Sequence, residues 1–275
     1  MYLSIWLERK KVGSNSLQRI PYKGWKTGFG NMFHRENSVW WGKKRKWIIQ
    51  TILWTFMING LLSIFIWFPG FPLQSSELLT PFFGILSVFG PLGIIIILQD
   101  SIVSEKQNGT AEWVLSKPIS RTSYYLAKLV SNSLNILLIG LVLQSVLFFA
   151  QIAAATGQLI NIGYLISGIA IIFLYFLFYI SLVLFLGIVS EHRTFVIGIT
   201  IIFIFTQSYL KTRLMAINPR ITEFLPSSLI PLASRISSGF AQLNSTNVAI
   251  NILSVAVYIV ILIYLSINTL RKKDY

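Results

Sequence analysis

The feature that most constrains this chain is a series of six apolar segments that carry no charged residue. A helix needs roughly 20 apolar residues to cross the hydrocarbon core of a bilayer. The segments cover residues 48–68, 79–98, 129–153, 162–189, 194–210 and 248–270. Because backbone polar groups in lipid must be satisfied internally, the natural spanning element is a helix. We therefore predict an all-α integral membrane protein with six transmembrane helices.

Composition and the breaks between segments agree with this prediction. The chain is 54% hydrophobic and 12% charged, whereas soluble domains carry about a quarter charged residues. The prolines and glycine of residues 69–72 predict that the first helix ends there, and Pro91 predicts a kink inside the second helix. Only residues 190–193 join the fourth and fifth segments, which predicts a tight antiparallel hairpin. The long segment 211–247 holds three prolines and predicts broken, partly membrane-dipping helices on the outer side.

The distribution of Lys and Arg predicts the orientation. Nineteen basic residues fall in segments 1–47, 99–128, 190–193 and 271–275, and the remaining four fall in segment 211–247. Since positive charge favours the cytoplasmic side, both termini are expected in the cytoplasm and the protein in the cell membrane. The net charge of +14 then fits anionic lipid better than nucleic acid. The polar, basic N-terminal segment does not have the pattern of a secretory signal peptide.

The cytoplasmic N-terminal segment 1–47 is expected to contain an amphipathic interfacial helix over residues 24–47. Apolar residues recur there at roughly helical spacing: Trp25, Phe29, Met32, Phe33 and Trp40. Lys26, Arg35 and Glu36 are expected on the other side of the helix. A membrane-interface anchor follows, made of Trp40, Trp41, Lys43, Lys44, Arg45, Lys46 and Trp47. Each basic residue near an anionic leaflet contributes about 1 kcal/mol, and an ordinary positive-inside anchor explains the same cluster.

The cytoplasmic loop 99–128 contains signals for a short helix between two longer ones. Asn108-Gly109 indicates a turn, and the Thr110 hydroxyl is expected to cap a helix with Glu112 in its first turn. Residues 111–115 form the expected helix body. Pro118 disfavours helix at the residue before it, and Ser120 is expected to cap the next helix.

At these residues the sequence resembles the ABC-2 type permease family. The resemblance rests on an ordered set of residues: Glu105, Gly109, Thr110, Glu112, Leu115, Pro118, Ser120, Arg121, Tyr124, Tyr125 and Lys128. It extends to the topology, with an interfacial elbow helix, six spans, and a long outer segment before the last span. Trp113 departs from the pattern, because aliphatic residues are more usual there.

The resemblance implies a division of labour between subunits. Such permeases pair as homodimers or related heterodimers, and the short helix docks on a separate ATPase subunit, which binds ATP and Mg²⁺. The implied ATPase-coupling residues are Glu105, Gly109, Thr110, Glu112, Trp113, Leu115, Pro118 and Arg121. In this interpretation Leu115 and Trp113 supply apolar contact and Arg121 pairs with an acidic partner. The chain has no G-x-x-x-x-G-K-[ST] motif, so no nucleotide site or enzymatic activity of its own is expected.

Polar residues within the spans leave two readings open. Asn59, Gln144, Gln151 and Gln207 could line a substrate path or bond between helices, and bonding is favoured. No ionisable residue lies in the middle of a span, which weakens the case for an ion-coupled transporter. With no cysteine and two separated histidines, no metal site is expected.

These observations favour the permease of an ATP-driven exporter for an apolar or amphipathic substrate, such as a lipid, a hydrophobic peptide or a drug. The alternatives are a partner-independent transporter and a non-transporting scaffold or mechanical ABC complex. A membrane enzyme is the weakest reading, because no catalytic constellation is evident.

Overall fold

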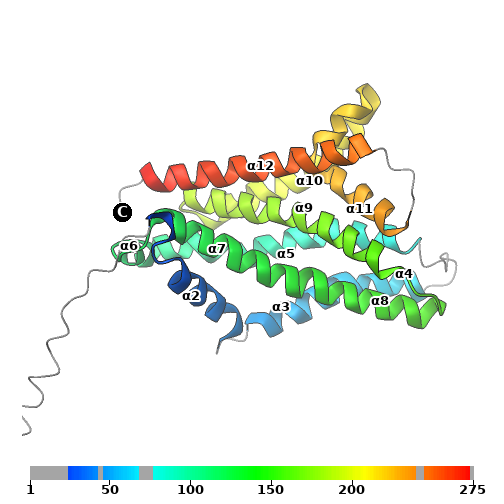
Figure 1. Cartoon of the computed structure of the whole chain (residues 1–275), viewed down its shortest axis with the longest axis horizontal. Coiled ribbons are helices and arrows are strands. Elements are labelled where there is room, and N and C mark those ends of the chain that lie inside the picture. Colours follow the sequence, from blue (N-terminus) through cyan, green and yellow to red (C-terminus); the bar gives the residue numbers. More distant parts are fainter. Residues whose placement is uncertain (1–23, 43–45, 68–76, 240–244, 273–275) are drawn as a thin grey trace, which may run out of the picture.

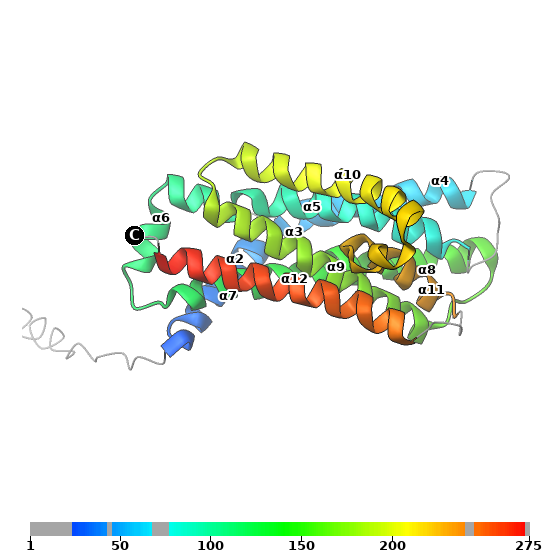
Figure 2. The same ribbon diagram turned by 90° about the horizontal axis from the view of Figure 1, so that it is seen from above.

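The computed structural model describes residues 24–42, 46–67, 77–239 and 245–272, and long helices dominate this part of the chain. Six helices are long and apolar enough to cross a membrane: Trp47–Trp67, Leu79–Gln107, Arg121–Thr156, Ile162–Val189, Arg193–Ile217 and Asn247–Lys272. They run side by side along the long axis of the molecule (Figures 1 and 2). The prediction of an all-helical protein with six membrane-spanning helices is therefore confirmed.

The first half of the chain forms the first three long helices and two shorter ones. A helix α2 (Phe29–Trp41) follows the short turn η1 (Gly24–Lys26). The first long helix consists of α3 (Lys46–Trp54), the π-helical segment η2 (Thr55–Gly60) and α4 (Leu61–Trp67). The second is α5 (Leu79–Gln107), and α6 (Thr110–Leu115) follows it. The third consists of α7 (Arg121–Ile136), the π-helical η3 (Leu137–Val142) and α8 (Leu143–Thr156).

The second half adds three long helices and a short outer cluster. The long helices are α9 (Ile162–Val189), α10 (Arg193–Ile217) and α12 (Ser245–Lys272). Between α10 and α12 lie η4 (Pro219–Phe224), η5 (Pro226–Ser228) and α11 (Leu229–Ser237). α9 packs extensively against α5, α11 and α12. In Figure 1, α6 lies at one end of the bundle and α11 toward the other.

Several helix ends differ from the predicted spans. α5 continues to Gln107, beyond the predicted end at residue 98, and it runs through Pro91 without interruption. α7 begins at Arg121, before the predicted start of the span at residue 129. Hydropathy locates the membrane boundary, whereas a helix continues into water wherever its backbone hydrogen bonds can form. Only residues 108–120 therefore separate the two long helices, and α6 lies among them.

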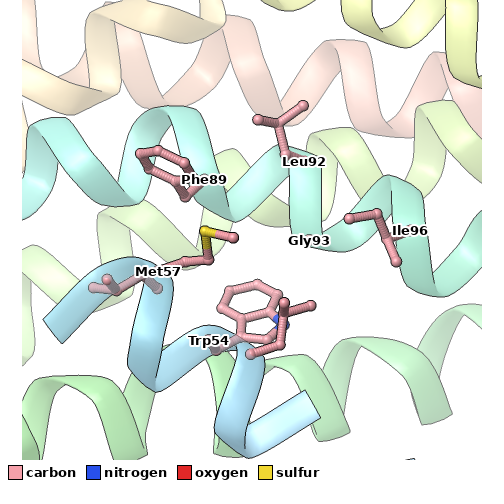
Figure 3. A pocket seen from close by; sticks show the side chains of 8 residues that line it. Trp54, Met57, Phe89, Leu92, Gly93 and Ile96 are labelled. Carbon is pink, nitrogen blue, oxygen red and sulfur yellow. The ribbon is translucent and has the colours of Figure 1, made fainter. Parts of the chain in front are cut away.

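Glycines allow the large aromatic residues of the core to approach neighbouring helices closely. A Cβ atom added at Gly93 would lie 2.7 Å from the Trp54 ring, and one added at Gly140 would lie 2.6 Å from it. Figure 3 shows Trp54 facing α5 beside Met57. Residues of η2 and α5 also line an apolar recess of about 130 Å³ here. The indole thus joins the first long helix to α5 and η3, where side chains larger than hydrogen would not fit.

The polar residues within the spans bond between helices. The Asn59 side-chain amide donates to Gln144 Oε1 over 2.6 Å, joining η2 to α8. The Gln151 amide donates to the Ser63 hydroxyl over 3.2 Å, and the Gln207 amide donates to the Tyr179 hydroxyl over 3.3 Å. Interhelical bonding, one of the two readings of Asn59, Gln144, Gln151 and Gln207, is what the structure shows.

Candidate functional site

The short helix α6 begins at a glycine that adopts a left-handed backbone conformation. Gly109 has a φ of 65° and is the N-cap residue of α6, and no side chain caps this end. The expected cap from the Thr110 hydroxyl is therefore wrong, because Thr110 already lies inside the helix as its first residue. The left-handed conformation suits glycine, since a Cβ atom is disfavoured there. Gly109 thus sets the sharp change of direction between α5 and α6.

α6 has a buried face and an exposed face. Ala111 and Val114 are buried, while Glu112 is exposed and Trp113 is 62% exposed. The Lys117 ammonium lies 3.3 Å from the centroid of the Trp113 ring, a cation–π contact that orders this surface. The contacts of α6 with its own chain are therefore made by Ala111 and Val114, and the apolar contact of Trp113 with an ATPase subunit stays a prediction. Three-residue spacing puts those two on one face and turns Trp113 outward.

Leu115 and the residues that follow it complete the turn into α7. Leu115 is half-buried against the core. α6 ends there, two residues before the Lys117-Pro118 bond, as predicted from the proline. The Ser120 hydroxyl accepts a hydrogen bond from the backbone N–H of Ser123 over 3.0 Å, which confirms the predicted cap of α7.

The segment before α2 lies against this turn. The Ser120 backbone N–H donates to the Thr27 carbonyl over 3.1 Å. A Cβ atom added at Gly28 would lie 2.7 Å from the Ile119 side chain. The N-terminal side of α2 and the connection from α6 to α7 therefore form one packed unit.

A buried cluster of charges holds α2, α5 and α7 together at this end of the bundle. The Lys128 ammonium lies 3.0 Å from Glu36 Oε1 and 3.1 Å from Glu105 Oε1, and the Lys128 side chain is only 1% exposed. The ammonium also donates to the Ser101 carbonyl over 3.0 Å. A buried ammonium is costly unless it is paired and hydrogen-bonded. Here three acceptors from two other helices surround it.

Glu105 is the centre of this cluster. Its Oε1 atom also accepts from the Arg35 guanidinium over 2.9 Å, and its Oε2 atom accepts from the Tyr124 hydroxyl over 2.5 Å. Two carboxylates face one guanidinium and one ammonium, so the ionised cluster is neutral. Glu105, predicted as an ATPase-coupling residue, thus binds to α2 and α7 of its own chain.

α2 packs against α7 through a face that the sequence did not assign correctly. Glu36 was expected on the polar side, but it is buried with Met32 and Trp40 because spacing of four residues places all three on one face. Trp40 was expected to anchor in the membrane interface. Instead its ring is 2% exposed, and its indole N–H donates to Asn132 Oδ1 over 3.0 Å.

The rest of the predicted interface anchor is described only in part. The Trp41 ring is exposed, donates to Asn135 Oδ1 over 2.6 Å and stacks on Trp47 at 5.7 Å between centroids. Lys43, Lys44 and Arg45 lie outside the described residues, and Lys46 is described only as the first residue of α3.

The end of α5 is also bound to the turn between α9 and α10. The Lys106 ammonium donates to the carbonyls of Ile188, over 3.0 Å, and of Ser190, at the C-terminus of α9. The Gln107 amide donates to the Glu191 carbonyl over 2.8 Å. A cation is favourable at a helix C-terminus, where carbonyl groups lack intrahelical partners. These bonds join α5 to the fourth and fifth long helices, as does an exposed ion pair between Asp100 and Arg193 at 2.5 Å.

Arg121, at the start of α7, binds the C-terminus of α12. Its guanidinium donates to the Leu270 carbonyl over 3.1 Å and to the Arg271 carbonyl over 2.6 Å. Within the chain its acceptors are these helix-end carbonyls, and an acidic partner for Arg121 on an ATPase subunit stays a prediction. The two carbonyls are available because the last carbonyls of a helix have no intrahelical donor.

α6 is therefore exposed on one face, while the helices on either side of it are bound to three other parts of the bundle. We define the "base cluster" as Arg35, Glu36, Glu105, Tyr124 and Lys128. With the bonds from Lys106 and Arg121, it joins α5 and α7 to α2, to the α9–α10 turn and to α12. A force applied to α6 would consequently reach most of the bundle. Tyr124 and Lys128 were named in the family resemblance, and Arg35 and Glu36 were expected on the polar side of the interfacial helix. The sequence did not join these residues into one cluster, and Lys106 was not identified. Four-residue spacing of Glu36 with Met32 and Trp40 was the available signal.

The fold defines the class of protein as a multi-pass α-helical membrane protein. A family model described as ABC-2 family transporter protein matches residues 31–275. The chain belongs to this family, which supports the resemblance found in the loop before α7. A comparison with curated proteins gave no match. Among the described residues, no group of three His, Asp or Glu side chains could hold a metal ion.

Proposed function

We propose that this chain is the membrane-spanning permease subunit of an ATP-driven exporter and that α6 docks on a separate ATPase subunit. The observation that carries the proposal is the contrast at α6. The helix presents Glu112 and Trp113 outward, and its flanking helices are bound to α2, α9 and α12. Membership of the ABC-2 family supports a role in membrane transport.

The proposed mechanism depends on the rigid connection between α6 and the rest of the bundle. ATP and Mg²⁺ are bound by the ATPase subunit, and closure of two such subunits displaces α6. Because α5 and α7 are bound to α2, to the α9–α10 turn and to α12, the displacement moves the bundle as a body rather than bending one loop. Two permease copies, identical or related, then move relative to each other. The energy comes from differential binding of the ATPase states to the permease states.

In the proposed orientation α6 lies in the cytoplasm. The excess of Lys and Arg at the α6 end and in the flanking segments supports this, because basic residues near span ends favour the cytoplasmic side. The outer end then carries η4, η5 and α11. An ATPase in the cytoplasm would meet the exposed face of α6 directly.

An apolar or amphipathic substrate is supported by the surfaces between the helices. A recess of about 520 Å³ lies between η3–α8 and α9, and aliphatic and phenylalanine side chains, with Ser145, line it. Val146, Phe149 and Ile166 are among them. Acyl chains or hydrophobic peptide side chains match such walls, whereas a hydrophilic solute would leave its polar groups unpaired there.

The test is co-purification from native membranes followed by an ATPase assay. A tagged chain should recover a nucleotide-binding protein with ATPase activity. Trp113→Ala and Glu112→Ala should reduce its recovery, because they remove the exposed face of α6. Glu191→Ala is the matched control, since Glu191 is exposed on the neighbouring α9–α10 turn. Recovery of a homo-oligomer with no ATPase would contradict the proposal, and so would equal recovery from the α6 variants and the control.

A further inference from the structure

The end of the bundle opposite α6 contains a polar pocket that differs in chemistry from the recesses between the spans. Its volume is about 410 Å³, and its walls come from α10, η4, α11 and α12. Figure 2 shows α11 lying between the ends of α10 and α12. The polar side chains that line it include two cations, one carboxylate and one amide: Lys211, Arg235, Glu223 and Asn251.

Two cations face this pocket without an acidic partner in contact. Lys211 of α10 and Arg235 of α11 both line it, and their like charges interact unfavourably. Among the ion pairs of the described residues, none includes Lys211, Arg235 or Glu223. With one carboxylate against two cations, these three groups give the pocket a net positive charge. Such an arrangement is stabilised by an anion.

A buried amide supplies an independent sign of a ligand. Asn251 lines the pocket and is 8% exposed, and its side-chain oxygen has no hydrogen-bond partner in the described part of the chain. Leaving a buried polar group unpaired costs about 1–3 kcal/mol. Because the two ends of an amide are assigned from their hydrogen bonds, the group can present its NH₂ to an acceptor as readily as its oxygen to a donor. A ligand with both hydroxyl and anionic oxygen atoms would satisfy it.

The depth of the pocket matches the head group region of a bilayer. At 1.5 Å per residue, Lys211 lies about 27 Å along α10 from Arg193, and the hydrocarbon core is about 30 Å thick. Met215, which lines the pocket, and Ile217 at the end of α10 are both exposed. The pocket therefore combines cations at head group depth with apolar surface beside them.

We propose that this pocket binds a phosphate-bearing anion, with Lys211 and Arg235 pairing with the phosphate and Asn251 bonding to an adjacent polar group. Lysine and arginine both recognise phosphate through charge-assisted hydrogen bonds. The phosphate belongs either to an anionic lipid head group or to a free ion. The site explains why cations remain on the outer side, where the positive-inside rule disfavours them. It does not depend on an ATPase partner, so its test is separate from that of the proposed function.

The test measures binding to the purified full-length chain with three probes. These are short-chain phosphatidylglycerol, phosphatidylcholine with the same acyl chains, and inorganic phosphate. Thermal stabilisation and native mass spectrometry report binding. Both lipids carry one phosphodiester, but the quaternary ammonium of choline cancels its charge and would be repelled by the two cations that line the pocket. Phosphatidylglycerol should therefore bind at least about tenfold more tightly than phosphatidylcholine, a difference of about 1.4 kcal/mol. Binding of inorganic phosphate as well would support the site and identify the phosphate alone as sufficient. Equal binding of both lipids with none of phosphate would overturn the proposal.

Variants locate the binding. K211Q combined with R235Q should weaken phosphatidylglycerol binding by about a hundredfold, roughly tenfold for each charge-assisted pair removed. K211R combined with R235K keeps both charges and should retain binding, which separates charge loss from misfolding. R220Q is the matched control, since Arg220 is exposed in the same segment and is not among the pocket-lining residues. Unchanged binding in the double Gln variant, or an equal loss in R220Q, would contradict the site.

Discussion

The ammonium group of Lys128 on α7 lies 3.0 Å from a carboxylate oxygen of Glu36 on α2, although 92 residues separate them in the chain. The same ammonium contacts Glu105 near the end of α5. This single buried cation therefore sets the relative positions of three helices beside α6. The short helix projects from a base that is fixed electrostatically as well as by apolar packing.

Removal of the buried cation should destabilise the protein far more than removal of an exposed one. Lys128→Met leaves Glu36 without its ion-pair partner, and losing one member of a buried pair costs about 3–5 kcal/mol. The matched control is Arg193→Met, whose pair with Asp100 is roughly half exposed, so its loss should cost about 1 kcal/mol or less. Unfolding free energies of the detergent-solubilised chain would be compared. Equal losses in the two variants would show that the base cluster does not stabilise the bundle.

The close approach of α5 and α9 requires a glycine at one position and not at another. A Cβ atom at Gly90 would lie 2.2 Å from the Phe176 ring, whereas one at Gly84 in the same helix meets nothing within 4 Å. Gly90→Ala should therefore destabilise by about 1–3 kcal/mol through overpacking. Gly84→Ala should be neutral or stabilise by up to about 1 kcal/mol through helix propensity. The comparison uses thermal unfolding, and a smaller effect at Gly90 than at Gly84 would contradict the packing of α5 on α9.

The left-handed turn at Gly109 should matter for coupling beyond its effect on stability. Gly109→Ala introduces strain of about 1–2 kcal/mol, and Gly109→Asn should be milder because asparagine tolerates this conformation. Gly157 is the matched control, since it has a φ of 66° and equally open surroundings at the other end of the bundle. Alanine at either position should lower stability similarly, but only Gly109→Ala should lower recovery of the ATPase. Equal recovery of the ATPase from the Gly109 and Gly157 variants would contradict a role of the Gly109 turn in docking.

The proposed orientation predicts which end of the bundle a reagent can reach from outside. The chain contains no cysteine, so a single introduced cysteine is a unique label. Ile217→Cys, at the exposed last residue of α10, should react with a membrane-impermeant maleimide in intact cells. Ser190→Cys, in the turn between α9 and α10, should react only after the membrane is opened. The reverse pattern would place α6 outside and contradict the proposed docking.

The sequence was sufficient for the membrane architecture because charge-free apolar length is a local property. Within the described residues all six predicted spans lie on helices, and the fourth coincides with α9. Residue 68, the predicted end of the first span, lies outside the described residues. The cap at Ser120 and the turn at Gly109 were also predictable, since both depend on residues close in the chain. Thr110 was assigned wrongly as a cap because the glycine before it already occupies that position.

The contacts that organise the candidate site could not be read from the sequence in the same way. The pairing of Lys128 with Glu36 depends on which face of α2 packs against α7. That packing is set by the tertiary structure and not by residues close in the chain. The same holds for Arg121, whose acceptors are backbone carbonyls near the end of the chain. Trp40 was predicted to lie in the membrane interface because tryptophan is common there, but Asn132 offered its indole a buried acceptor.

The most direct test of the central claim is crosslinking from the exposed face of α6. Trp113→Cys, as the single cysteine of the tagged chain, would be treated in native membranes with a short thiol-to-amine crosslinker. The account predicts a crosslinked product that contains a P-loop ATPase and is absent with Ile217→Cys at the opposite end. Efficient labelling of Trp113→Cys without any ATPase adduct, or the same adduct from both positions, would contradict docking through α6.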